Sequence, residues 1–235
     1  MLSFMKLHRF YTRETIGGSK EISLSDEGLA HQLRNVFRLK TGDSIVLFDG
    51  SGFEYVSSIT NLTNESVDVT IKDSSNTCFT PEKNIHILQS IVKKDNFEWI
   101  LEKCTEIGAN EFTPVISERT EKKNLNIERA EKILVEASEQ SGRCAIPKLH
   151  QTEDLKDVLE THGKNLVVFH LDGEKFDKKD FAKSKDVKVL VGPEGGWSER
   201  EVEEMKKVGV KIYTLGKQVL RAETAVIAIS TLFLL

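Results

Sequence analysis

The stretch VKVLVGPEGGWSEREV, residues 187–202, decides the fold class of this chain. It opens with a continuous apolar run, Val187–Val191, and turns through three glycines. A helix follows, in which Ser198 and Glu201 have the spacing of a capping box. A strand that is apolar on both faces is typical of a parallel sheet covered on both sides. We therefore expect a buried parallel strand followed by a helix.

Strands and helices alternate in the same way around this stretch. Further runs of strand length lie at Ile85–Val92, Glu111–Ile116, Leu166–Leu171 and Lys211–Leu215. The helical pattern predicts an amphipathic helix over Asn126–Gly142, with Ile127 on its buried stripe, and a terminal helix over Ala225–Leu235. Another helix is expected to begin at a cap, Asp95, and to end at Gly108. The pattern predicts an α/β domain.

The first third of the chain has a β pattern instead. Ser44–Phe48 and Phe53–Ile59 flank a glycine-bearing turn, which suits a hairpin. A helix over Gly28–Phe37 is expected to bury Val36 and Phe37 together with the leucines of the same face. This part of the sequence therefore predicts a small domain built mainly from strands.

A polar segment that contains Pro81 follows the β pattern. Polar and proline-bearing linkers are where domain boundaries usually fall. We therefore predict a small domain at residues 1–73 and a larger one at residues 74–235.

Composition sets broad limits on function. The chain has 235 residues, of which 39% are hydrophobic and 30% charged, and a net charge of −4. An RNA-binding function would therefore need a local basic patch, because the overall charge gives no attraction to nucleic acid. The sequence shows neither a signal-peptide pattern nor the run of about 20 apolar residues that spans a membrane. We expect a cytoplasmic protein.

The cysteines are Cys78, Cys104 and Cys144. They are far apart, odd in number and form no CxxC pair. This spacing predicts neither a zinc site nor a disulfide, and it fits a reducing compartment.

Two loops at predicted strand ends could carry chemistry, because ligands bind at the carboxyl ends of strands in open α/β sheets. The first is Gly192–Trp197. Its glycines could simply make a tight turn, or they could let the backbone approach a flat ligand. A phosphate is disfavoured, because the spacing matches no phosphate-binding motif and the next turn carries Glu199 and Glu201. A neutral or cationic ligand fits better.

The second loop, Leu215–Ala225, leads into the apolar terminal helix. Arg221 and Glu223 could be solvated residues of a surface turn. Charges at the edge of a core usually meet each other or a ligand, which favours a site.

Four parts of the sequence carry a resemblance to a known family. They are HRFY (8–11), EKCTEIGA with TPVISER (102–119), EASEQSGRCAIP (136–147), and the two loop sequences VGPEGGWSEREV (191–202) and LGKQVLRAETA (215–225). With these the chain resembles the SPOUT-class methyltransferases, specifically the bacterial 16S ribosomal RNA uridine-N3 methyltransferase family. The matching stretches span nearly the whole chain in order.

The resemblance implies a fold and a cofactor. The fold is a PUA-like β-barrel followed by an α/β SPOUT domain with a C-terminal trefoil knot, in a homodimer that receives 16S ribosomal RNA or the small ribosomal subunit. The cofactor is S-adenosylmethionine, bound in the knot. Its implied binding residues are Leu171, Gly192, Pro193, Glu194, Gly195, Gly196, Leu215, Gly216, Val219, Leu220, Arg221, Thr224 and Ala225.

Basic residues interleaved with aromatic ones near the N-terminus form a candidate RNA-binding surface. Basic side chains pair with phosphates and aromatic rings stack on bases. An ordinary first strand with one polar face would give the same pattern. The candidate residues are Lys6, His8, Arg9 and Arg13.

The implied reaction moves the sulfonium methyl group to N3 of a uridine. Because N3 carries a proton, the enzyme must stabilise the uracil anion or remove the proton. We expect Arg221 and Glu223 to do so, with Glu139 and Arg143 as further candidates, and no metal is required. Two other interpretations remain open, a nucleotide-binding enzyme of another class and an RNA-binding module without catalysis.

Overall fold

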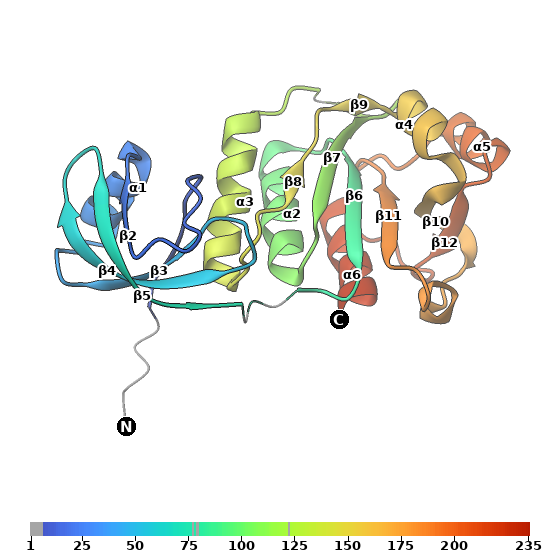
Figure 1. Ribbon diagram of the computed structural model, residues 1–235. Helices are drawn as coiled ribbons and strands as arrows, with labels where there is room; N and C mark the ends of the chain where they lie inside the picture. Colours follow the sequence, from blue (N-terminus) through green and yellow to red (C-terminus); the bar gives the residue numbers. More distant parts are fainter. Residues whose placement is uncertain (1–6, 77, 79, 122) are drawn as a thin grey trace. The chain divides into compact units, whose positions relative to one another are not determined.

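The computed structural model describes residues 7–76, 78, 80–121 and 123–235. The chain divides into two compact units (Figure 1). The first comprises residues up to Thr80 together with Ser138–Ile146, and the second comprises Pro81–Ala137 together with Pro147–Leu235. The domain boundary predicted at residues 73 and 74 lies within a strand, β5 (Val67–Ser75), and stays a prediction.

Five strands of the first unit form one sheet in the order β1-β3-β4-β5-β2. Besides β5, whose range is given above, they are β1 (Arg9–Tyr11), β2 (Glu21–Leu24), β3 (Ser44–Phe48) and β4 (Glu54–Leu62). β1 runs parallel to β3, and the remaining neighbours are antiparallel. The predicted hairpin is confirmed, because β3 pairs with β4 across a turn in which Gly50 and Gly52 have φ of 84° and 89°.

The predicted helix over Gly28–Phe37 is two elements, α1 (Glu27–His31) and a π-helical turn, η1 (Gln32–Val36). Leu29 and Leu33 enter the core as expected. The prediction was wrong for Val36 and Phe37, which are 63% and 36% exposed. A π-helical turn changes the helical period, so a residue one turn later no longer falls on the same face.

The second unit contains a parallel sheet in the order β12-β10-β11-β6-β7-β8, with β9 paired to β7. Every pair in it is parallel, which confirms the predicted sheet type. Its strands are β6 (Asn84–Ser90), β7 (Glu111–Ile116), β8 (Lys148–Leu149), β9 (Glu153–Asp154), β10 (Leu166–Lys175), β11 (Asp186–Val191) and β12 (Lys211–Thr214).

Helices cover this sheet. The α-helices are α2 (Lys94–Ile107), α3 (Ile127–Ser141), α4 (Leu155–His162), α5 (Glu199–Lys207) and α6 (Ala222–Leu234), and the short 3-10 turns are η2 (Gly163–Asn165) and η3 (Lys178–Phe181). α6 packs against β6, β11 and α2 (Figure 1). Two leucines and a valine of α4 pack with Met205 of α5 on Leu88 and Leu190 of the sheet. None of the helices in the described part is long and apolar enough to cross a membrane.

Three predicted helix details were wrong. Lys93, and not Asp95, is the N-cap of α2, because the helix begins one residue before the aspartate. Ile127 is 41% exposed, since it is the first residue of α3 and lies beyond the buried stripe. The terminal helix begins at Ala222, three residues earlier than expected, whereas Gly108 ends α2 as predicted.

Candidate active site

A cavity of about 340 Å³ opens in the second unit beside the middle of β10, where β11 and β12 end and α6 begins. This volume is within the range of small-molecule sites. Its wall is formed by Phe169–Leu171 in the middle of β10, the loops after β7, β11 and β12, and the first turn of α6. The site therefore lies at the carboxyl ends of parallel strands, where a ligand is expected in an open α/β sheet.

The loop after β11 is held by a network of hydrogen bonds at the start of α5. The backbone N–H of Ser198 donates to Glu201 Oε2 at 2.8 Å, and the N–H of Glu201 donates to Ser198 Oγ at 3.3 Å, which confirms the predicted capping box. The second oxygen of Glu201 accepts from the N–H of Glu118 at 2.8 Å. Because the chain's own side chains already satisfy this helix end, the site does not resemble a phosphate cradle.

Packing inside the protein leaves little room for a side chain at two glycines of this loop. A Cβ at Gly192 would lie 3.1 Å from the Trp197 ring, and one at Gly195 would lie 3.3 Å from Arg119 Cδ. Gly196 has φ of 65°, a conformation that side chains other than glycine rarely adopt. Their close approach to a ligand stays a prediction.

The glycine loop is also tied to segments far away in sequence. Arg119, from the loop after β7, donates from Nη1 to the carbonyl oxygen of Gly195 at 2.7 Å. Gln89 at the end of β6 donates to the carbonyl oxygen of Gly192 at 3.2 Å. These contacts fix the loop against the neighbouring strand ends.

Most of the predicted cofactor residues line the cavity. They are Leu171, Gly192, Pro193, Glu194, Gly195, Gly196, Leu215, Val219, Leu220 and Ala225. Gly216, Arg221 and Thr224, all within the described part, belong to the same loop but do not line it.

The sequence reasoning missed several residues of the wall. They are Arg119, Phe169, His170, Val191, Trp197, Thr214, Gln218 and Ala222. Arg119 follows β7, so the rule that ligands bind at the carboxyl ends of strands could have found it.

Arg221 and Glu223 differ strongly in their surroundings. Arg221 is exposed and is the N-cap of α6, without a side-chain hydrogen bond to the helix. Glu223 is 4% exposed, and its Oε2 has no hydrogen-bond partner among the described residues. No ion pair joins the two in the described part of the chain, so a structural Arg221–Glu223 pair does not explain them. A buried carboxylate oxygen without a partner is unusual and marks a functional candidate.

Glu139 and Arg143 belong to the first unit. Glu139 accepts from the N–H of Tyr11 at 2.9 Å through one oxygen and from Gln32 at 3.2 Å through the other. Arg143 is 8% exposed, and this burial lowers the pKa of its guanidinium to about 10. Both residues therefore contribute to the structure of the first unit, and a catalytic role for either stays a prediction.

The predicted RNA-binding residues are also in different environments. Lys6 lies outside the described residues. His8 and Arg13 are exposed, and the His8 ring lies 4.6 Å from that of Phe37. Arg9 forms an ion pair with Glu54 and donates to the carbonyl oxygen of Arg143 at 3.1 Å. Its charge is thus partly neutralised within the protein.

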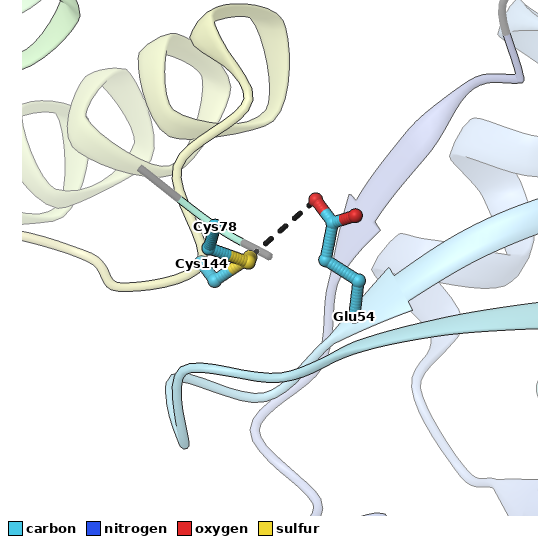
Figure 2. A group of neighbouring side chains, drawn as sticks. All are labelled: Glu54, Cys78 and Cys144. Carbon is cyan, nitrogen blue, oxygen red and sulfur yellow. Dashed lines mark hydrogen bonds between the residues drawn. A yellow bond between two sulfur atoms is a disulfide. The ribbon is translucent and has the colours of Figure 1, made fainter. Parts of the chain in front are cut away.

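The expectation that the cysteines form no disulfide was wrong. Cys78 and Cys144 are joined by a disulfide, with their Cα atoms 5.8 Å apart, and Cys104 is free and buried. Figure 2 shows the carboxylate of Glu54 directed at this bond, with Oε1 3.5 Å from Cys144 Sγ. The two cysteines are 66 residues apart, and only the folding of the 138–146 segment into the first unit brings them together.

The sequence matches two family models. Residues 80–234 match an RNA methyltransferase domain, and residues 26–72 match an RNA methyltransferase PUA domain. The chain belongs to the RNA methyltransferase family. The cavity lies within the part of this RNA methyltransferase that matches the first model.

Individual relatives agree with this assignment over nine-tenths or more of their length. The Ribosomal RNA small subunit methyltransferase E of Rickettsia conorii is 29% identical, over 95% of this chain and 93% of the relative. The protein of that name from Bacillus subtilis is 28% identical, over 91% and 90%. A crystal structure of the Neisseria gonorrhoeae enzyme of the same name, bound to S-adenosyl methionine, is 30% identical with a TM-score of 0.86, over 95% of each chain.

Proposed function

We propose that this RNA methyltransferase transfers the methyl group of S-adenosylmethionine to N3 of a uridine in the 16S ribosomal RNA of the small ribosomal subunit. The observation that carries the proposal is the cavity between the two predicted loops, because ten of the predicted cofactor residues line it. The relatives named Ribosomal RNA small subunit methyltransferase E, and the S-adenosyl methionine bound to the Neisseria gonorrhoeae structure, support the choice of substrate and cofactor.

The charges around the cavity suit this cofactor. S-adenosylmethionine combines a cationic sulfonium with a carboxylate and has no phosphate. Glu194 lines the cavity and provides a negative charge for the cationic part, while Arg119 provides a positive charge for the carboxylate. The capped start of α5 leaves little for a phosphate to bind. These features favour the cofactor over a nucleoside triphosphate.

The chemical step requires a uracil anion. As the methyl group leaves the sulfonium sulfur, N3 forms the new bond and its proton passes to a base, leaving S-adenosylhomocysteine. Arg221 is exposed, and its neighbours Leu220 and Ala222 both line the cavity. Its guanidinium can therefore reach a uracil ring placed there. We assign Arg221 to stabilising the uracil anion. We assign Glu223 either to positioning the uracil or to accepting its N3 proton. Glu139 and Arg143 follow as second candidates.

The finer features of the fold and its partners are part of the same proposal. They are a PUA-like barrel that holds RNA through Lys6, His8, Arg9 and Arg13, a SPOUT domain with a trefoil knot, a homodimer and a cytoplasmic location. One feature of the chain path supports the knot. After the edge strand β12, the chain returns to the middle of the sheet, where α6 packs on β6 and β11. A ribosomal RNA substrate supports the proposed cytoplasmic location.

Ligand binding and methyl transfer, measured on the same protein, test the proposal. Calorimetry should show binding of S-adenosylhomocysteine and none of ATP, and labelled methyl groups should pass from the cofactor to ribosomal RNA. A nucleotide-binding enzyme would give the reverse preference in calorimetry. An RNA-binding module without catalysis would bind RNA and transfer no label.

A further inference from the structure

Three histidines gather in the second unit, away from the cavity. The rings of His86 in β6 and His150 after β8 are stacked with their centroids 4.9 Å apart. The ring of His162 at the end of α4 lies edge-on to His86 at 6.3 Å. They are three of the six histidines in the chain. Histidine is the commonest metal ligand among protein side chains, so this grouping raises the question of a bound ion.

Strand register brings a carboxylate into the same group. His86 in β6 is the direct partner of Glu111, the first residue of β7. The N–H of His150 donates to the carbonyl oxygen of Phe112 at 2.8 Å, which places His150 beside the start of β7. Its Nε2 then lies 2.6 Å from Glu111 Oε2. The group lies toward the amino ends of the strands, whereas the glycine loop follows the carboxyl end of β11.

We propose that His86, Glu111 and His150 bind a divalent transition-metal ion, and that Zn²⁺ fits this set best. Two imidazoles and one carboxylate, with water in a fourth position, form an established zinc donor set. Ca²⁺ and Mg²⁺ are disfavoured because they prefer oxygen ligands throughout. The sequence led us to expect no bound metal, so this proposal departs from that expectation, and the site is separate from the methyl transfer.

The distances require only local movement. One ligand atom from each of the three residues lies within 4.8 Å of the other two. Donors around a tetrahedral zinc ion are about 3.3 Å apart, as metal–ligand distances near 2.0–2.1 Å imply. The side chains of His150 and Glu111 are 25% and 41% exposed, so they have room to rotate toward an ion.

A second residue supports His86 as a ligand. Its Nε2 forms a 2.8 Å hydrogen bond with the hydroxyl of Thr113, which is buried in β7. Metal-binding histidines usually make such a bond, which fixes the ring and its tautomer.

His162 is not part of the proposed donor set. Its Nδ1 lies 3.1 Å from Nζ of Lys188, and an ammonium can only donate in such a bond. The ammonium also opposes a cation nearby, and the carboxylate of Glu111 offsets that effect. The competing explanation is a hydrogen-bonded His150–Glu111 pair with stacked rings and no metal.

Calorimetry with Zn²⁺ on the metal-free full-length protein tests the proposal. The Cys78–Cys144 disulfide is kept intact, so that these thiols cannot bind the ion. We expect one ion per chain and at least tenfold weaker binding for each of H86Q, E111Q and H150Q. H31Q, which changes an exposed histidine of α1, should bind as the wild type does. Absence of a stoichiometric site, or equal affinity in the three variants, would overturn the proposal.

Two further measurements test the proposal even if some of these variants do not fold. Co²⁺ in place of Zn²⁺ should give the visible bands of a four-coordinate site without a thiolate charge-transfer band, and a thiolate band would contradict the assignment. A 100-fold excess of Zn²⁺ over its Kd should raise the melting temperature by about 5 °C or more. E111Q, whose side chain is part exposed, should fold and lose this rise, and an undiminished rise in E111Q would overturn the proposal.

Discussion

Arg119 donates a 2.7 Å hydrogen bond from Nη1 to the carbonyl oxygen of Gly195. The bond connects the loop after β7 with the glycine loop after β11, and both residues line the cavity. Because the bond is exposed to solvent, it contributes less than the roughly 1.5–3 kcal/mol that is typical of a buried hydrogen bond with a charged donor. Arg119 therefore holds the loop after β11 and places a positive charge at the proposed cofactor site.

Removal of this side chain should weaken cofactor binding. We expect Arg119→Ala to reduce the affinity for S-adenosylhomocysteine by about tenfold or more, with Arg119→Lys intermediate, because a lysine keeps the charge and loses the planar donor geometry. Calorimetry measures both variants. Arg200→Ala serves as the control, since Arg200 pairs with Glu204 on the exposed face of α5. An affinity for Arg119→Ala equal to that of the control would remove Arg119 from the site.

Arg221→Ala should slow the chemical step and leave cofactor binding nearly intact. One preorganised electrostatic donor typically accounts for a factor on the order of 10²–10³ in rate. Single-turnover methylation at saturating cofactor, over a series of pH values, measures the loss. Lys217→Ala changes an exposed cation of the same loop that does not line the cavity, and should keep the wild-type rate.

Glu223→Gln examines the buried carboxylate separately. If the carboxylate accepts the N3 proton or orients the base, the amide should lower the rate as strongly as Arg221→Ala does, because it keeps the volume and removes the charge. A wild-type rate for both variants at saturation would assign the chemistry elsewhere, with Arg143 and Glu139 as the next candidates.

Reduction of the Cys78–Cys144 disulfide should destabilise the first unit. A cross-link over a long loop stabilises a fold by about 2–4 kcal/mol, so reduction should lower the melting temperature by roughly 5–15 °C. The double variant C78S/C144S should melt at the lower temperature with or without reductant. Thiol counting on the denatured protein should find one free cysteine of the three before reduction. Three free thiols in the untreated protein would show that the bond is absent.

Acid should destabilise the turn between β3 and β4 through Asp49. Burial raises the pKa of this carboxyl, but hydrogen bonds from Ser51 and from the N–H of Ile16 outweigh burial and lower the pKa overall. Stability from such a group is present above the unfolded pKa, near 3.9, and is lost as the pH falls through the lower folded value. The stability gap between wild type and Asp49→Asn should therefore shrink from pH 5 to pH 2.5 in urea unfolding. A gap that does not change with pH would contradict this role, and Glu65→Gln, on the exposed β4–β5 turn, is the matched control.

The sequence predicted the parallel sheet and the capping box because both depend on local patterns. Apolar runs such as Val187–Val191 specify strands buried on both faces, and Ser198 with Glu201 carries the cap within four residues. The π-helical turn after α1 could not be predicted in this way. Its geometry depends on how the helix packs on the sheet, and the helical period alone placed Val36 in the core.

The contacts that the sequence did not predict join segments that are distant along the chain. Arg119 meets Gly195 across 76 residues, and Cys78 meets Cys144 across 66. The same holds for His86 and His150, which strand register brings together. Hydrophobic periodicity has no information on such pairs, because it reports only which face of an element is buried.

Nucleoside mass spectrometry of 16S ribosomal RNA tests the central proposal most directly. Small ribosomal subunits that lack the modification are incubated with the purified protein and S-adenosylmethionine, and their RNA is digested and analysed. The proposed function predicts N3-methyluridine at one position, and its loss with Arg221→Ala. RNA without N3-methyluridine, from protein that is folded and binds S-adenosylhomocysteine, would contradict it.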